Sequence, residues 1–308
     1  MTSVTLEQTL LGVRFRNPVL TASGTFGNGE EFANFYDLSR LGGFVTKAVT
    51  PEPRIGNPAP RIIETPSGML NAIGLQNEGL DVFADEILPR IASFDTAIIV
   101  NVAGRTAEDY ERVCKRLTVE PAIAAFEINI SCPNVKEGGI TFGCSAIASS
   151  DLVRRLKAVS TKPLIVKLTP NVTDIRDVAR SVEDAGADAV SLINTLTGMV
   201  VNVETRSPML ANVTGGLSGP AIRPVAVRMV YEVARAVSVP VIGIGGIFSA
   251  RDALEFIIAG ASLVQAGSGM FVKPLLPLEI IDGIESYMRR HEIPALDALI
   301  GSLTADGR

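Results

Sequence analysis

Residues 129–134, Asn-Ile-Ser-Cys-Pro-Asn, bring a thiol, a hydroxyl and two amides together. The preceding run, residues 124–130, is short and apolar with β-branched members, which predicts a buried strand. Proline has no N–H to donate to a sheet, so Pro133 marks the end of that strand. Cys132 is therefore expected at the mouth of a buried strand, where a thiol can do chemistry. A packing role is the alternative, because free cysteine is often buried as a small hydrophobe.

The composition is that of a globular protein with a sizeable core. Of the 308 residues, 47% are apolar and 20% are charged, which fits one large α/β barrel or two ordinary domains. The net charge is −5 and there is no run of five like charges, so nothing indicates nucleic acid or an anionic membrane as a partner. Residues 1–16 lack an apolar core of signal-peptide length. The longest uncharged stretch, 256–272, is interrupted by glycine and polar residues and is not expected to span a membrane.

The cysteine and histidine counts restrict the chemistry. Cys114, Cys132 and Cys144 form no Cys-x-x-Cys pair, which favours reduced thiols in a cytoplasmic protein over disulfides or a zinc site. Cys114 is predicted to pack within a helix, and no role is assigned to Cys144. The single histidine, His291, argues against a Ser/His/Asp triad and against a histidine-based metal site. No metal is therefore expected, and a cysteine, lysine or carboxylate must act as the general base.

Short apolar strand candidates alternate with amphipathic helical segments along the whole chain. Thr106 and Asp109 have capping-box spacing and predict a helix that ends near Leu117. Parallel βα units follow from such alternation, and eight of them close into a (β/α)8 TIM barrel. The eight strand candidates are Pro18–Ala22, Gly43–Ala48, Ala97–Val102, Phe126–Ile130, Pro163–Leu168, Ala189–Ile193, Pro240–Ile244 and Ser262–Ala266.

Two segments, Thr50–Pro66 and Leu196–Gly219, are too long for ordinary connections between a strand and a helix. Long loops of this kind are usually functional. No low-complexity stretch or interdomain linker interrupts the pattern. We therefore expect one domain, residues 1–308, with two inserted loops over the barrel mouth.

Each predicted strand ends in a polar residue or a glycine after an apolar body. A single such end is explained by the start of a solvated loop. Eight agreeing ends predict that these residues together form a shared polar floor at the barrel mouth. Active sites of such barrels lie at these strand ends. The residues are Ser23, Lys47, Asn101, Asn129, Lys167, Asn194, Gly245, Gly246, Gly267 and Ser268.

Three features of this floor predict a ligand. The glycine-rich turns at 243–246 and 266–269 follow the last two strands, where exposed backbone N–H groups suit a phosphate. Lys47 and Lys167 could lie along the surface with their charged ends in water, but inside a barrel mouth each would need an anion. Amides recognise a flat ring with carbonyl and N–H edges; the set is Asn71, Asn77, Asn129, Asn134 and Asn194, with Thr195.

Together these features suggest an enzyme that uses flavin mononucleotide (FMN), one per chain. In such a scheme the cysteine takes a proton from carbon while the flavin takes a hydride.

Over essentially its whole length the chain resembles the dihydroorotate dehydrogenases of cytosolic class 1. Several of the matching motifs are specific, and their order and spacing match as well. The version of the motif at 71–77, and residues 212–219, look like the class 1B catalytic subunit. The motifs are Thr21–Gly27, Lys47, Asn71–Asn77, Asn129–Asn134, Lys167, Ile193–Thr195, Gly215–Ala221 and the two glycine turns.

The resemblance implies a role for each matching residue. Cys132 would be the base that removes the C5 proton of dihydroorotate, while the C6 hydride goes to the flavin. The substrate-binding residues would be Lys47, Asn71, Ala72, Ile73, Gly74, Leu75, Asn129, Asn134, Asn194 and Thr195. The flavin-binding residues would be Ser23, Lys47, Ala48, Asn101, Asn129, Lys167, Ile193, Gly219, Gly245, Gly246, Gly267 and Ser268, the last four at the phosphate.

The resemblance also implies partners. In class 1B the electrons leave for a second subunit that carries FAD and a 2Fe–2S cluster and reduces NAD. This chain has neither a dinucleotide fingerprint nor four cysteines for a cluster. We therefore expect a homodimer of this chain joined by two such electron-transfer subunits.

Three alternatives stay open at the level of sequence. One is a class 1A enzyme, which reduces fumarate without a partner. Another is a flavin-free isomerase or synthase acting on phosphorylated sugars, which would share the glycine cradle but would be colourless. The third is a non-catalytic subunit that merely binds flavin, which the presence of Cys132 and Lys47 disfavours.

Overall fold

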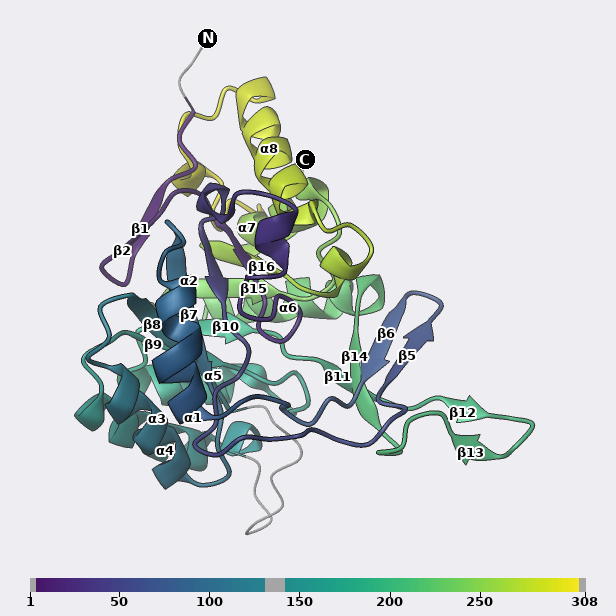
Figure 1. The fold of residues 1–308 in the computed structure, drawn as a ribbon. Helices are drawn as coiled ribbons and strands as arrows, with labels where there is room; N and C mark the ends of the chain where they lie inside the picture. The colour runs from purple at the N-terminus through teal and green to yellow at the C-terminus, as the bar shows by residue number, and fades with distance from the viewer. Residues whose placement is uncertain (1–3, 131–141, 305–308) are drawn as a thin grey trace.

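The computed structural model describes residues 4–130 and 142–304. Its centre is a closed parallel barrel in the order β3–β4–β7–β8–β9–β10–β15–β16, with β16 paired back to β3 (Figure 1). Each of the eight predicted strands is present, so the predicted (β/α)8 fold is confirmed. The barrel strands are β3 (Val19–Thr21), β4 (Gly43–Val45), β7 (Ala97–Val102), β8 (Ile123–Asn129), β9 (Leu164–Lys167), β10 (Ala189–Leu192), β15 (Val241–Ile244) and β16 (Leu263–Ala266).

Helices surround the barrel and cover its outer face (Figure 1). The α-helices are α1 (Leu80–Val82), α2 (Leu88–Ile91), α3 (Ala107–Leu117), α4 (Ala146–Val159), α5 (Ile175–Asp184), α6 (Arg223–Ala234), α7 (Ala250–Ala259) and α8 (Leu276–Arg290). The π-helix η3 (Phe83–Ile87) joins α1 to α2. The short 3-10 segments are η1 (Phe32–Asn34), η2 (Leu38–Arg40), η4 (Phe142–Cys144), η5 (Pro220–Ile222), η6 (Ser268–Phe271) and η7 (Leu296–Ala298).

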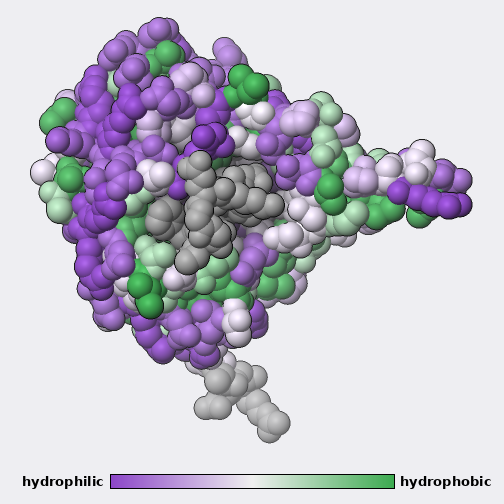
Figure 2. Space-filling view, turned by 90° about the horizontal axis from the view of Figure 1, so that it is seen from below, coloured by the Kyte–Doolittle hydropathy of each residue, from purple (hydrophilic) through white to green (hydrophobic). Residues whose placement is uncertain are grey.

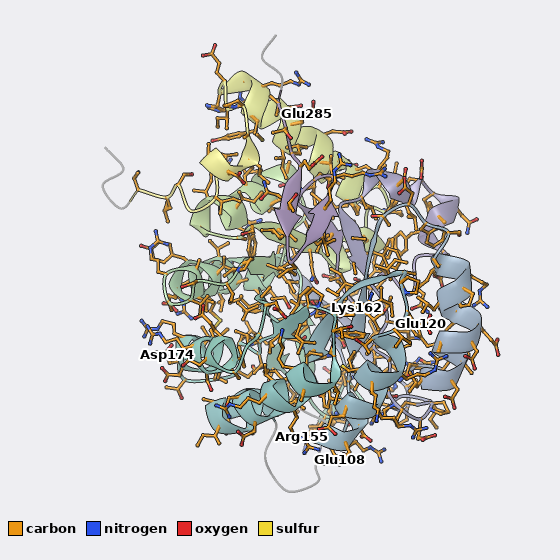
Figure 3. The ribbon with its side chains drawn as sticks, turned by 90° about the vertical axis from the view of Figure 1, so that its left-hand side faces the viewer. Glu108, Glu120, Arg155, Lys162, Asp174 and Glu285 are labelled. Atoms are coloured by element: carbon orange, nitrogen blue, oxygen red, sulfur yellow. The ribbon has the colours of Figure 1, made fainter. Side chains whose placement is uncertain are left out.

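The predicted start of α3 is confirmed in detail. The Thr106 side chain accepts a hydrogen bond from the Asp109 backbone N–H, and the Asp109 side chain accepts one from the Thr106 N–H. This capping box satisfies two of the N–H groups that a helix start leaves unpaired. On the outer side of the same helix, Glu108 lies beside Arg155 of α4, with Oε1 2.6 Å from Nη2 (Figure 3). The guanidinium lowers the pKa of the Glu108 carboxyl to about 2.

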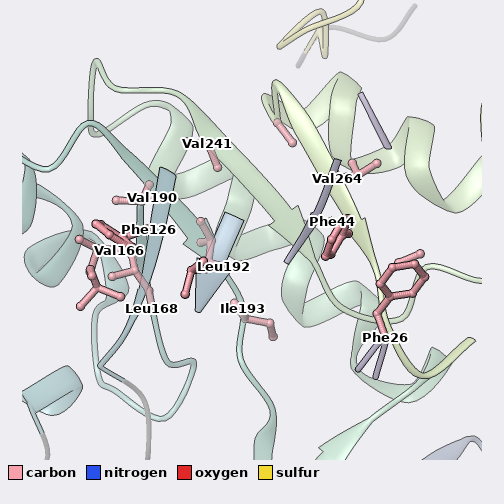
Figure 4. Packing of buried hydrophobic residues seen from close by; sticks show 14 of the residues in the cluster. Phe26, Phe44, Phe126, Val166, Leu168, Val190, Leu192, Ile193, Val241 and Val264 are labelled. Atoms are coloured by element: carbon pink, nitrogen blue, oxygen red, sulfur yellow. The ribbon is translucent and has the colours of Figure 1, made fainter. Parts of the chain in front are cut away.

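Two apolar layers hold the barrel and its helices together. Outward-facing residues pack against the helices, and Figure 4 shows Phe126, Val166 and Val190 from neighbouring strands in this cluster. Inside the barrel, a smaller cluster fills the half at the amino ends of the strands. Phe15, on the hairpin formed by β1 (Gln8–Leu10) and β2 (Val13–Phe15), closes that end of the barrel. Because side chains alternate along a strand, the next inward-facing position toward the carboxyl end lies in the polar layer. The interior below the mouth is therefore packed, and a ligand can enter only from the carboxyl ends of the strands.

The two segments predicted as inserted loops contain strands. In the first segment lies β5 (Ile62–Thr65), and β6 (Gly68–Asn71) follows just beyond its predicted end. Both join β14 (Gly215–Ser218) and β11 (Leu196–Gly198) of the second segment in an antiparallel sheet of order β11–β14–β6–β5. Between β11 and β14, the hairpin β12 (Val201–Asn202) and β13 (Ser207–Pro208) projects away from the barrel as an arm (Figure 1). The arm carries hydrophobic residues along one side and hydrophilic ones at its tip, whereas the body of the molecule is largely hydrophilic in the same view (Figure 2).

Glycine allows β14 to lie close to β6 and to the chain at Thr195. A Cβ on Gly68 would lie 2.0 Å from the carbonyl oxygen of Ser218, and a Cβ on Gly216 would lie 2.0 Å from Oγ1 of Thr195. No side chain can occupy either position without moving the backbone next to it. Within the described ranges, no helix is both long enough and apolar enough to cross a bilayer.

We predict that Gly216→Ala destabilises the protein, because its new Cβ collides with Thr195 at Cβ as well as Oγ1. Overpacking of this kind typically costs about 1–3 kcal/mol, which corresponds to a Tm lower by roughly 5 °C for a chain of this size. Thermal unfolding followed by circular dichroism measures the change. Gly198→Ala in the same sheet is the control, because its Cβ meets only side-chain atoms at longer distances, Leu70 Cδ2 at 3.1 Å and Leu217 Cβ at 3.8 Å. Equal Tm values for the two variants would contradict this account of the sheet.

Candidate functional site

A cavity of about 820 Å³ lies between the carboxyl ends of the barrel strands and the four-stranded sheet. Every predicted strand-end residue lines it, so the shared polar floor exists. The lining includes the predicted residues Ser23, Lys47, Ala48, Asn71, Ala72, Ile73, Gly74, Leu75, Asn101, Asn129, Lys167, Ile193, Asn194, Thr195, Gly245, Gly246, Gly267 and Ser268. Cys132 and Asn134 lie outside the described residues.

Two predicted residues are placed elsewhere. Gly219 is not part of the lining; it packs under the cavity wall, where its carbonyl oxygen is 2.7 Å from the Cβ position of Gly246. Asn77 does not face this cavity either. Its Oδ1 accepts the Gly79 N–H at 2.8 Å, and its Nδ2 donates to Thr50 Oγ1 and the Leu75 carbonyl, both at 2.8 Å. With all its polar atoms used in joining two loops, Asn77 has none left for a ring, so that prediction is wrong.

Glycines form one end of the cavity. Gly245 and Gly246 have φ angles of +130° and +74°, which side-chain-bearing residues rarely adopt. A Cβ on Gly245 would lie 2.9 Å from Cβ of Ala226. Bare backbone is therefore required here by conformation and by space, and Gly267 and Ser268 face the same end of the cavity. Such a concave, side-chain-free surface suits a phosphate group.

A carboxylate that the sequence reasoning overlooked lies under the floor. Glu127 of β8 is fully buried, and its oxygens accept hydrogen bonds from four side chains. Asn101 Nδ2 and Lys167 Nζ donate to Oε1 at 2.8 and 3.3 Å, and Ser191 Oγ and Gln265 Nε2 donate to Oε2 at 3.0 and 2.9 Å. A signal was available, because Glu127 shares a strand face with Asn129 in an otherwise apolar run.

The two floor lysines differ in their partners. Lys167 forms an ion pair with Glu127, so its counter-charge comes from the chain itself and the expectation that it needs a bound anion is wrong. Lys47 also lines the cavity, but among the described residues it forms no ion pair with any carboxylate. A cation left without a carboxylate at the bottom of a cavity favours an anionic ligand.

Two lining residues were not singled out by the sequence analysis: Arg61, just before β5, and Asn171, in the loop between β9 and α5. Arg61 reaches the cavity and donates from Nη2 to Gln76 Oε1 at 2.5 Å. Asn171 donates to the Thr195 carbonyl at 3.0 Å and accepts from the Thr197 N–H at 2.9 Å, which fixes the chain that carries Thr195. These residues lie in segments with no strong periodicity, and only the fold brings them to the barrel mouth.

The described thiols are unlike a catalytic cysteine. Cys114 is completely buried in α3, and burial raises the pKa of its thiol to about 12, which agrees with the predicted packing role. Cys144 is exposed, with its Sγ 3.9 Å from the Asn171 carbonyl. Neither Cys114 nor Cys144 lines the cavity.

The residues present fit FMN. The glycine end suits its phosphate, and the cavity also presents amides and lysines to a planar ring. Asn101 supplies a specific test, because its Oδ1 is buried at the cavity floor and has no hydrogen-bond partner among the described residues. Buried polar atoms are rarely left unpaired, so an N–H of a ring in the cavity would satisfy it.

Comparison with known proteins places this site in a family. A family model described as dihydroorotate dehydrogenase matches residues 5–288. A protein of Trichlorobacter lovleyi named dihydroorotate dehydrogenase B (NAD(+)), catalytic subunit, is 56% identical over 291 residues, covering 94% of this chain and 96% of its own length. A protein of the same name from Bacteroides thetaiotaomicron is 52% identical, with 94% and 96% covered.

A solved structure agrees on the fold. The crystal structure of DHODH from Eimeria tenella, in complex with ferulenol, superposes with a TM-score of 0.81 at 24% identity, covering 96% of this chain and 88% of the other. At that identity the likeness concerns the fold alone. The family match, the relatives above half identity and the lining of the cavity agree, and the chain belongs to the dihydroorotate dehydrogenase family.

Proposed function

We propose that this chain oxidises (S)-dihydroorotate to orotate in pyrimidine biosynthesis, with FMN as the immediate electron acceptor. The observation that carries the proposal is the cavity, which is lined by a lysine that forms no ion pair within the described ranges, by several amides and by a glycine cradle. The relatives' shared name supports the same activity and the NAD(+)-linked B form over the fumarate-reducing alternative.

The chain's residues divide between substrate and cofactor. When bound, FMN supplies the two-electron acceptor that no side chain can provide. The backbone at Gly245, Gly246 and Gly267 would hold its phosphate, and Asn101 and Lys167 would contact its ring. Lys47 would bind the carboxylate of dihydroorotate, a match of charge in a site partly shielded from water.

The remaining amides would orient the substrate. Asn71, Asn194 and Thr195 line the part of the cavity covered by the inserted sheet, where they can both donate to and accept from the two amide edges of a dihydropyrimidine ring. Holding the ring in one orientation keeps the hydrogens at its C5 and C6 aligned with the groups that remove them.

Proton removal would fall to Cys132. A free thiol has a pKa of about 8.5, so modest help makes it a thiolate near neutral pH. A base whose pKa is close to the working pH transfers protons most effectively. The thiolate would take the C5 proton as the C6 hydride leaves, which oxidises the ring by two electrons and forms its double bond.

The electrons must then leave the chain. We propose a cytoplasmic assembly in which a homodimer of this chain is joined by two subunits carrying FAD and a 2Fe–2S cluster, which pass the electrons to NAD. The designation of the relatives as a catalytic subunit supports the existence of a partner.

The decisive measurement is the absorbance spectrum of the purified chain. We expect a yellow protein whose flavin absorbance bleaches when dihydroorotate is added without air, because the hydride is transferred within this chain. Orotate should appear in equal amount. A colourless protein would favour the isomerase alternative, and rapid fumarate reduction by the chain alone would favour the class 1A alternative.

Replacing the proposed base should separate flavin binding from catalysis. We predict that Cys132→Ala binds FMN normally but reduces it about 10²–10⁴ times more slowly at neutral pH, the usual contribution of a positioned base. Anaerobic stopped-flow spectroscopy measures the rate. Cys144→Ala, which removes an exposed thiol outside the cavity, is the matched control and should remain within about twofold of the original rate.

The serine variant tests the same assignment by pH. A hydroxyl is a much weaker acid than a thiol, so Cys132→Ser should regain part of the rate as pH rises. A flat pH profile would count against proton removal by residue 132.

Removal of the Lys47 charge should weaken substrate binding. We predict that Lys47→Met raises KM for dihydroorotate at least about 30-fold, since loss of one partner of a shielded charge pair costs roughly 2–5 kcal/mol. Steady-state kinetics with an artificial electron acceptor measure it. Lys115→Met on the exposed side of α3 is the control for charge alone, and an equal effect there would rule out direct contact by Lys47.

A further inference from the structure

We propose that Glu127 is a positioning residue that fixes Lys167 and Asn101 at the flavin site and lowers the reduction potential of the bound flavin. The inference rests on the proposed function in one respect, namely that FMN occupies the cavity. Glu127 itself does not line the cavity, so it would act through the two residues that do and through the field of its charge.

The two oxygens of Glu127 have different partners. Oε1 accepts from Asn101 Nδ2 at 2.8 Å and from Lys167 Nζ at 3.3 Å, and both of these residues line the cavity. Oε2 accepts from Ser191 Oγ at 3.0 Å and from Gln265 Nε2 at 2.9 Å, and neither of these does. One oxygen is thus anchored to the barrel wall while the other holds two groups at the floor.

The carboxylate determines which way the Asn101 amide points. An ionised carboxylate only accepts hydrogen bonds, so the Asn101 NH₂ must face Glu127. The other end of the amide, Oδ1, is then directed elsewhere; it is buried, and no residue in the described part of the chain is its hydrogen-bond partner. The amide therefore offers an acceptor to a ring N–H, and reversing it would place two oxygens against each other.

Lys167 is held from two sides. Besides Glu127, its Nζ is 3.2 Å from Oγ of Ser23, which also lines the cavity. A flexible ammonium with two fixed partners loses most of its freedom to follow the ligand. Its position is therefore set by the barrel before the flavin binds.

Barrel stability alone does not explain this arrangement. On the same two strands, the preceding inward-facing residues, Ala125 and Ile165, fill the barrel interior with apolar side chains. Burying an ion pair usually costs more in desolvation than a well-packed apolar replacement would. A charged pair directly beneath the cavity is thus better explained by what it does to the ligand.

The charge of Glu127 should shift the reduction potential of the bound flavin in a predictable direction. Reduced flavin carries more negative charge than oxidised flavin, so a nearby cation favours the reduced form and a nearby anion opposes it. Glu127 offsets part of the charge of Lys167. The pair therefore gives the ring an oriented N–H donor without the full field of an isolated ammonium.

The test is the flavin midpoint potential of the FMN-loaded Glu127→Gln protein, measured by spectroelectrochemistry. Glutamine keeps an oxygen for Lys167 and Asn101 but removes the negative charge. We expect reduced FMN to gain at least about tenfold in affinity relative to oxidised FMN, which is a rise of about 30 mV for a two-electron couple. A potential that is unchanged or lower would overturn the proposal.

Two further variants complete the experiment. Ser191→Ala removes one donor to the same carboxylate without altering charge, and should leave the potential unchanged. Glu127→Asp keeps the charge but retracts it from Lys167, so its potential should lie between the original and Glu127→Gln; if Glu127→Gln does not fold, Glu127→Asp against Ser191→Ala decides. If Ser191→Ala shifted the flavin potential by the same amount, Glu127 would have only a structural role in the barrel.

Failure of the inference is distinguishable from failure of the proposed function. If the unaltered chain binds no FMN, the proposed function fails. If it binds FMN and oxidises dihydroorotate but the Glu127 variants keep the original potential, only the positioning role fails.

Discussion

A carboxylate enclosed in a barrel must find all its partners inside, and the upper half of this barrel is arranged around that requirement. The oxygens of Glu127 receive side chains from four other strands: β7, β9, β10 and β16. An incompletely paired charge at this depth would be very costly. The donors are thereby fixed in position. Two of them, Asn101 and Lys167, form part of the cavity floor, so that part of the floor is fixed as well.

The small sheet that covers the cavity depends on a second constraint: segments far apart in the chain must lie in close contact. The strand β6 pairs with β14, more than a hundred residues later in the chain, and this pairing brings Asn71 and Thr195 to one cavity. The contact needs glycine at 68 and 216, where a Cβ would lie 2.0 Å from the neighbouring strand or loop. The barrel supplies the floor, and a separate small sheet supplies Asn71 above it.

Sequence reasoning succeeded where local pattern and architecture coincide. The barrel strands are short apolar runs whose ends carry the polar groups, so all eight strands and the floor could be predicted. The sheet of the inserts could not, because β14, Gly-Gly-Leu-Ser, has no alternation and its partner is distant in the chain. Glu127 was overlooked because a single charge did not outweigh the apolar character of its strand. The assignment of Cys132 stays a prediction, since that residue lies outside the described part of the chain.

The difference between the two lysines shows what the fold adds to the sequence. Both end a strand, and by sequence alone they are equivalent cations that each need an anion. In the structure, Lys167 has its counter-charge within the barrel, whereas Lys47 forms no ion pair among the residues described. A balanced cation can donate to a neutral ring without demanding a full negative charge, while an unbalanced one selects a carboxylate. The placement of one glutamate thus turns two like residues into sites for two different ligands.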